Sequence, residues 1–137
     1  MSTPFTPPRP PCHIGIVTNE LDRATSDLRR RFGLSWSAPR TVTEECITPA
    51  GRAGWAIRVA HSSGPIAIEL IEGGAGSPWA CSVLTDLHHY AFWSSNLAAD
   101  VAALEQKRYE VELTSPPKPA HRPASPTSSV TGRPASS

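Results

Sequence analysis

The chain has 137 residues, a formal net charge of +1 and 18% charged residues, with acids and bases interspersed. It has no basic stripe of the kind that binds nucleic acid, and no apolar run approaches the roughly 20 residues of a membrane span. We therefore expect neither nucleic acid nor a membrane as a partner. The three cysteines are an odd number without C-x-x-C spacing, which is typical of reduced thiols and predicts a cytoplasmic protein.

Composition divides the chain into three parts. Eleven of the 15 prolines lie before residue 12 or after residue 115. Residues 1–11 are a Pro-rich N-terminal arm, and residues 115–137 contain no Ile, Leu, Phe, Tyr, Trp or Met. A segment of that composition cannot offset its ordering entropy by burial, so we expect a disordered Pro/Ser/Thr-rich tail. Residues 12–114 remain as the one domain able to bury a core.

The first half of this domain predicts a strand, a helix and three further strands. Residues 12–18 are rich in β-formers, and Asn19 is placed to cap the helix that follows. Apolar residues then recur at helical spacing as far as Gly33, a natural residue for a left-handed helix end; they are Leu21, Ala24, Leu28 and Phe32. The three further strands are expected at residues 39–48, 54–61 and 65–72, separated by turns rich in Gly, Pro and Ser.

The second half begins the same pattern again after a loop at residues 73–86. Residues 87–94 predict a strand, Ser95 or Asn96 a helix cap, and residues 109–114 a further strand, with an offset of roughly 75 residues from the first copy. The last two strands of a second copy would fall in residues 115–137, whose composition does not predict strands. The sequence therefore predicts an α+β fold of paired β-α-β-β-β modules, the second of them truncated.

Three polar residues in otherwise apolar strands share one arrangement. Alternate residues of a strand lie on the same face, so each of His13, Glu69 and His89 has a small residue beside it on its own face. These small residues are Gly15, Ala67 and Ala91. Small neighbours leave room for a metal and a ligand. The same alternation favours His89 over His88 and Glu69 over Glu72.

Two imidazoles and one carboxylate suit a divalent metal such as Zn, Ni, Co, Mn or Fe. Because the spacing is long and irregular, a second interpretation stays open. It takes the three as unrelated: a strand-end histidine, a solvent-facing glutamate and a half-buried histidine. Glu44, Glu45 and His61 are interpreted as surface groups. The cysteines are interpreted as packing residues, because none has an obvious activating partner; they are Cys12, Cys46 and Cys81.

The chain resembles the vicinal oxygen chelate superfamily, which includes glyoxalase I, methylmalonyl-CoA epimerase, bleomycin-resistance proteins and extradiol dioxygenases. The matching stretches cover about residues 12–113; they are C-H-I-G-I-V-T-N-E-L-D-R-A, F-G-L-S-W, I-A-I-E-L-I-E-G, G-S-P-W and L-H-H-Y-A-F-W-S-S-N-L-A-A-D. The likeness is strongest to glyoxalase-like and epimerase-like members. It implies two β-α-β-β-β modules that form an open, barrel-like mixed sheet around a metal.

The resemblance also implies roles for individual residues. His13, Glu69 and His89 correspond to three metal ligands of the family, and Glu69 would also be the catalytic base. The family's fourth ligand, usually Glu, lies on a last strand that this sequence lacks, so we expect weakened metal affinity and poor or no turnover. The absence of this strand from the sequence predicts a truncated or frame-shifted reading frame, or a natural loss of the last hairpin. A homodimer, common in the family, would be one way to supply a substitute strand.

The function implied by the resemblance is that of a metal-dependent lyase or isomerase. Its substrate would be a small thioester, hemithioacetal or similar molecule that chelates a metal through adjacent oxygens. Trp79 and Trp93 are candidate substrate-binding walls of the pocket, or else ordinary packing aromatics. Two alternatives stay open: a non-catalytic small-molecule binding or sequestering protein of the resistance type, and an inactive truncated product.

Overall fold

The computed structural model describes residues 12–64, 67–116 and 132–134. The predicted N-terminal arm, and most of the predicted tail, lie outside the described residues. The elements in chain order are β1 (His13–Val17), α1 (Leu21–Phe32), β2 (Arg40–Thr48), β3 (Gly51–His61), β4 (Ile68–Gly73), β5 (Asp86–Ala91), α2 (Leu97–Gln106), β6 (Tyr109–Val111) and β7 (Gly132–Pro134). The helices in this part of the chain are too short or too polar to cross a membrane.

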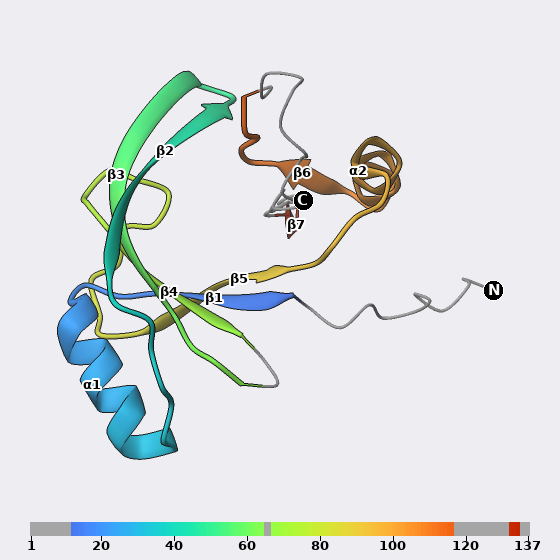
Figure 1. The fold of residues 1–137 in the computed structure, drawn as a ribbon. Coiled ribbons are helices and arrows are strands. Elements are labelled where there is room, and N and C mark those ends of the chain that lie inside the picture. The colour runs from blue at the N-terminus through green and yellow to red at the C-terminus, as the bar shows by residue number, and fades with distance from the viewer. Residues whose placement is uncertain (1–11, 65–66, 117–131, 135–137) are drawn as a thin grey trace, which may run out of the picture.

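Five strands form one open mixed sheet in the order β2-β3-β4-β1-β5 (Figure 1). Only β1 and β4 run parallel to each other, whereas the other neighbouring pairs are antiparallel. The predicted α+β class and the first β-α-β-β-β module are therefore confirmed. The first strand of the second module, β5, pairs directly with the first strand of the first module, β1.

Alternation along the strands gives this sheet two different faces. Helix α1 covers one face, where its buried residues pack on Ala60 of β3 and Leu70 of β4. The opposite face carries a second apolar cluster, which consists of Val17, Cys46, Ile57, Val59, Ile71 and Trp79. Val17 and Ile71 share their strand faces with the predicted ligands of β1 and β4. The candidate site therefore lies on the face that α1 leaves open.

The start of α1 differs from the prediction. The N-cap residue is Glu20, which makes no capping bond with its own side chain, while Asn19 donates through Nδ2 to the carbonyl of Ser82 instead. The Glu72 carboxylate on β4 accepts from the backbone N–H of Leu21 at 2.6 Å and thus fills the capping role from a distance. The end of the helix is as predicted, because Gly33 adopts a φ of 68° and donates to the carbonyl of Arg29.

The apolar stripe of α1 is shorter than the periodicity predicts, because Phe32 is 70% exposed. In the second module, Asn96 caps α2 by accepting from the backbone N–H of Ala99, as one of the two predicted caps. Helix α2 buries none of its residues. The following strand β6 is shorter than predicted and pairs with β7, which comprises three residues of the segment predicted to be a disordered tail.

Candidate metal centre

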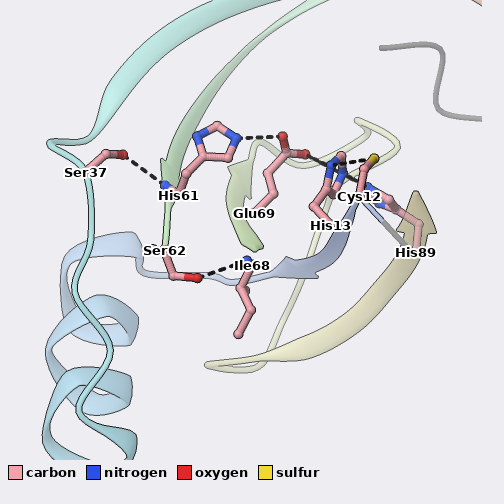
Figure 2. A network of polar contacts seen from close by, with 8 residues as sticks. All are labelled: Cys12, His13, Ser37, His61, Ser62, Ile68, Glu69 and His89. Atoms are coloured by element: carbon pink, nitrogen blue, oxygen red, sulfur yellow. Dashed lines mark hydrogen bonds and ion pairs between the residues drawn. The ribbon is translucent and has the colours of Figure 1, made fainter. Parts of the chain in front are cut away.

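Three neighbouring strands bring His13, Glu69 and His89 together, as Figure 2 shows. Strand β1 lies between β4 and β5, so its residue Gly15 pairs with Glu69 on one side and with His89 on the other. His13 lies two positions before Gly15 and therefore on the same face. The site thus follows from the sheet order, because residues far apart in sequence occupy adjacent positions on three adjacent strands.

The ligand atoms of the three side chains form a small triangle. The Nε2 atoms of His13 and His89 are 3.0 Å apart. Glu69 Oε1 lies 3.7 Å from His13 Nε2 and 3.9 Å from His89 Nε2. A point equidistant from three atoms with these separations is about 2.1 Å from each, which matches the bond lengths of Zn²⁺ to imidazole and carboxylate. The residues present therefore fit a divalent metal.

Burial keeps His89 in the form that binds metals. Its side chain is only 6% exposed, and this desolvation, with the neighbouring His88 and His13 as smaller contributions, lowers the pKa of His89 to about 4, although the Glu69 carboxylate acts in the opposite direction. The ring is consequently neutral at physiological pH. A neutral imidazole offers one nitrogen lone pair to a metal without first losing a proton.

His88 lies against His89, contrary to the sequence prediction that placed it on the other face. The pairing of β1 with β5 shifts register between Gly15↔His89 and Ile16↔Leu87, which leaves His88 without a partner on β1. Such a β-bulge interrupts the alternation of side chains and re-aims one of them. His88 Nδ1 is 2.8 Å from His89 Nδ1, and His88 Nε2 is 2.8 Å from the carbonyl oxygen of Pro78.

His61 also belongs to the site, and its interpretation as a surface group was wrong in this respect. It lies directly opposite Glu69 in the antiparallel pairing of β3 with β4. Its Nε2 donates to Glu69 Oε2 at 2.9 Å, while Glu69 Oε1 faces the two other histidines (Figure 2). The His61 side chain is 36% exposed, so the contact lies at the open edge of the site.

Gly15 provides the space that the His89 ring occupies. A Cβ atom at this position would overlap Cε1, Nδ1 and Nε2 of that ring. The sequence argument linked Gly15 to room for a metal; the structure shows that the His89 ring fills this room. Cys12 lies beside the site as well, with its sulfur 3.8 Å from His13 Nδ1, and burial raises the pKa of its thiol. That thiol is therefore protonated and can donate to the ring.

The two predicted substrate-binding tryptophans lie in different environments. Trp79 is 8% exposed and packs in the apolar cluster, with its ring edge-to-face against Trp55 at a centroid distance of 6.2 Å. Little of its surface is left for a substrate. Trp93 follows the end of β5 and is 44% exposed. Of the two, Trp93 has the surface that a substrate contact needs.

An open mixed sheet with two histidines and one glutamate converging on its uncovered face is the arrangement of a vicinal oxygen chelate domain. The family model that matches the chain, over residues 12–124, is described as the Glyoxalase/Bleomycin resistance protein/Dioxygenase superfamily. The chain belongs to this superfamily. A search among curated proteins found no match.

Proposed function

We propose that the protein is a metal-dependent lyase or isomerase whose substrate is a small thioester, hemithioacetal or similar molecule with adjacent oxygens. The observation that supports this proposal is the triangle of His13 Nε2, His89 Nε2 and Glu69 Oε1, whose dimensions suit a divalent ion. Zn, Ni, Co, Mn and Fe all accept such a donor set. When bound, the metal would polarise the substrate oxygens as a Lewis acid.

Glu69 is the residue that we propose as catalytic base. Oε2 accepts from His61, which orients the carboxylate, and Oε1 faces the position between the two other ligands. In the proposed reaction Glu69 accepts the proton from the carbon beside the substrate carbonyl and later returns one proton to the substrate. The carboxylate thus ends the cycle in its starting state. Trp93, at the end of β5, is the proposed contact for the body of the substrate.

Metal binding is the first test. Protein stripped with a chelator and reloaded with Zn, Ni, Co or Mn should retain about one metal per chain, as expected for a single site with three protein donors. His13→Ala and His89→Ala should abolish this retention. Glu69→Gln should weaken it, whereas Glu45→Gln should not, because Glu45 lies on β2 and pairs at the surface with Arg52. Metal retention in wild type that equals the background of the two alanine variants would refute the site.

Proton exchange then separates the enzyme from a binding protein. Loaded protein in D₂O should promote deuterium exchange at the carbon beside the carbonyl of a small thioester or hemithioacetal, and Glu69→Gln should remove that exchange. Substrate binding by the loaded protein without exchange, in every metal form, would contradict the catalytic proposal. It would favour the sequestering function, in which the same site holds a small molecule without chemistry.

We also propose that the protein is a homodimer formed at the β5 edge of the sheet. In the described residues β5 pairs on one side only, and its Leu87 and Tyr90 are 53% and 54% exposed. An unprotected strand edge with apolar side chains favours pairing with a second copy. Sedimentation equilibrium should give the mass of two chains, and Tyr90→Lys should shift it toward one. A monomer at all concentrations would refute this proposal.

A further inference from the structure

We infer that His88 is a positioning residue, which fixes the tautomer of His89 so that the Nε2 lone pair of His89 faces the metal centre. The inference deepens the proposed function and rests on it. His88 lies outside the proposed ligand set, yet it joins His89 to the backbone through two short contacts. These two hydrogen bonds run from His89 through His88 to the carbonyl oxygen of Pro78. Because that oxygen can only accept, it determines the direction of both bonds.

The backbone carbonyl of Pro78 determines the first step. A carbonyl oxygen can only accept, so the contact of 2.8 Å requires that His88 Nε2 carries the proton and donates it. A neutral imidazole has a single N–H. With that N–H at Nε2, the Nδ1 atom of His88 is a lone pair and acts as an acceptor.

The second step transfers this constraint to His89. Its Nδ1 atom is 2.8 Å from the acceptor Nδ1 of His88, so it must be the donor. The single N–H of neutral His89 therefore lies at Nδ1, and its Nε2 atom holds the lone pair. That lone pair is 3.0 Å from Nε2 of His13 and 3.9 Å from Oε1 of Glu69, within the proposed ligand triangle.

The opposite tautomer of His89 is unfavourable in this position. It would place two lone pairs against each other across a contact of 2.8 Å between the two Nδ1 atoms. The side chain of His89 is 6% exposed, so water cannot readily compensate for the lost bond. An unmade hydrogen bond at a buried polar atom costs about 1–3 kcal/mol, which corresponds to roughly a fivefold to 150-fold preference between the two tautomers.

The backbone is built to make this contact. Without the bulge at His88, alternation would direct this side chain to the face of the sheet that carries α1. The absence of a Cβ at Gly15 lets the His89 ring lie across β1. A hydrogen bond to the far nitrogen of a ligating histidine commonly orients the ring and raises its basicity toward the metal. Here that partner is a second histidine rather than a carboxylate.

The tautomer can be measured in the wild-type protein without metal. Long-range ¹H–¹⁵N correlation spectra of the histidine rings at pH 7.5 distinguish a protonated Nδ1 from a protonated Nε2. We expect the His89 resonances, assigned by comparison with His89→Gln, to show a protonated Nδ1. A protonated Nε2 in His89 would overturn the inference, whether or not the protein binds a metal.

Cobalt binding measures the consequence. Titration with Co²⁺, followed by its visible absorption, should show that His88→Leu binds about 10–100-fold more weakly than wild type. His88→Asn should recover most of this loss, because its side-chain oxygen can accept from His89 Nδ1–H near the position of the lost nitrogen. Glu45→Gln is the control, since Glu45 lies on β2 and pairs with Arg52 at the surface, away from the site.

These outcomes separate the inference from the proposed function. Equal Co²⁺ affinity of His88→Leu and wild type would overturn the role of His88 while leaving the metal site intact. Equal weakening in His88→Leu and His88→Asn, with circular dichroism showing both folded, would also overturn it. Failure of wild type to bind any metal would refute the proposed function, whereas the nitrogen spectra would still decide the tautomer.

Discussion

Acidification should destabilise the metal-free protein through His89. The folded protein holds the pKa of this buried ring at about 4, whereas an exposed histidine of the unfolded chain has a pKa of about 6.5. Between these values the unfolded chain binds a proton that the folded protein does not. His89 therefore leaves the free energy of unfolding unchanged above pH 6.5 and lowers it as the pH falls from 6.5 to 4. Below pH 4 the contribution of His89 changes no further.

The two pKa values set the size of this effect. Between pH 7.5 and pH 5, linkage predicts a loss of about 2 kcal/mol in the free energy of unfolding, and below pH 4 the loss reaches about 3 kcal/mol. The full effect is expected because the side chain is 6% exposed and solvent screening is small. A loss of this size is a large part of the total stability of a domain of about 100 residues.

Urea denaturation in the presence of a chelator measures the loss. The free energy of unfolding is compared at pH 7.5, 6 and 5 for wild type and for His89→Gln, which keeps a polar side chain but cannot titrate. The carboxylates contribute equally to both proteins, so the difference between the two pH profiles isolates His89. If the two profiles were parallel within about 0.5 kcal/mol, His89 would not be a buried neutral ring and the reasoning would fail.

Two further substitutions test the packing of the site and the start of α1. Gly15→Ala should displace the His89 ring, lower the stability by about 1–3 kcal/mol and weaken Co²⁺ binding at least about tenfold. Gly54→Ala is the control, because a Cβ at Gly54 on β3 would make only ordinary van der Waals contacts. Equal effects of Gly15→Ala and Gly54→Ala would refute the reasoning. Glu72→Ala should cost about 1–2 kcal/mol by removing the cap of Leu21. Unchanged thermal unfolding of Glu72→Ala would contradict that capping role.

The spacing of apolar residues and the turn-forming residues between the apolar segments were sufficient to predict the element order of the first module. Alternation also selected His13, Glu69 and His89, and the structure brings these three together. The selection succeeded because all three strands lie side by side in the sheet, in the order β4-β1-β5. One face of three adjacent strands is a continuous surface, so a rule that assigns faces also groups the residues.

A contact between helix α1 and strand β4, which lie far apart in the sequence, explains why the local rule failed at the start of α1. Asn19 has the side chain of a good N-cap, but the free N–H of Leu21 is bonded by Glu72, which lies on β4. A charged carboxylate bonds such an N–H more strongly than a neutral amide does. No window of neighbouring residues contains that information, because it depends on how β4 packs against the beginning of the helix.

His61 was accessible in principle from the sequence. It and Glu69 lie four positions on either side of Pro65, in a segment that reads as two strands joined by a turn. Residues placed symmetrically about a hairpin turn face each other across the two strands, as His61 and Glu69 do in the observed register. The signal was therefore pairing across the turn, which the alternation within each single strand does not report.

His88 shows the limit of alternation most clearly. Two adjacent histidines in one strand should point to opposite faces, and that rule assigned His89 to the site and His88 to the other face. A bulge at His88 breaks the rule at the position where His88 lies 2.8 Å from Nδ1 of the proposed ligand His89. Bulges recur beside functional sites because one inserted residue re-aims a side chain without changing the rest of the strand. In this chain, the exception to the strand pattern therefore marks the site as clearly as the residues that obey it.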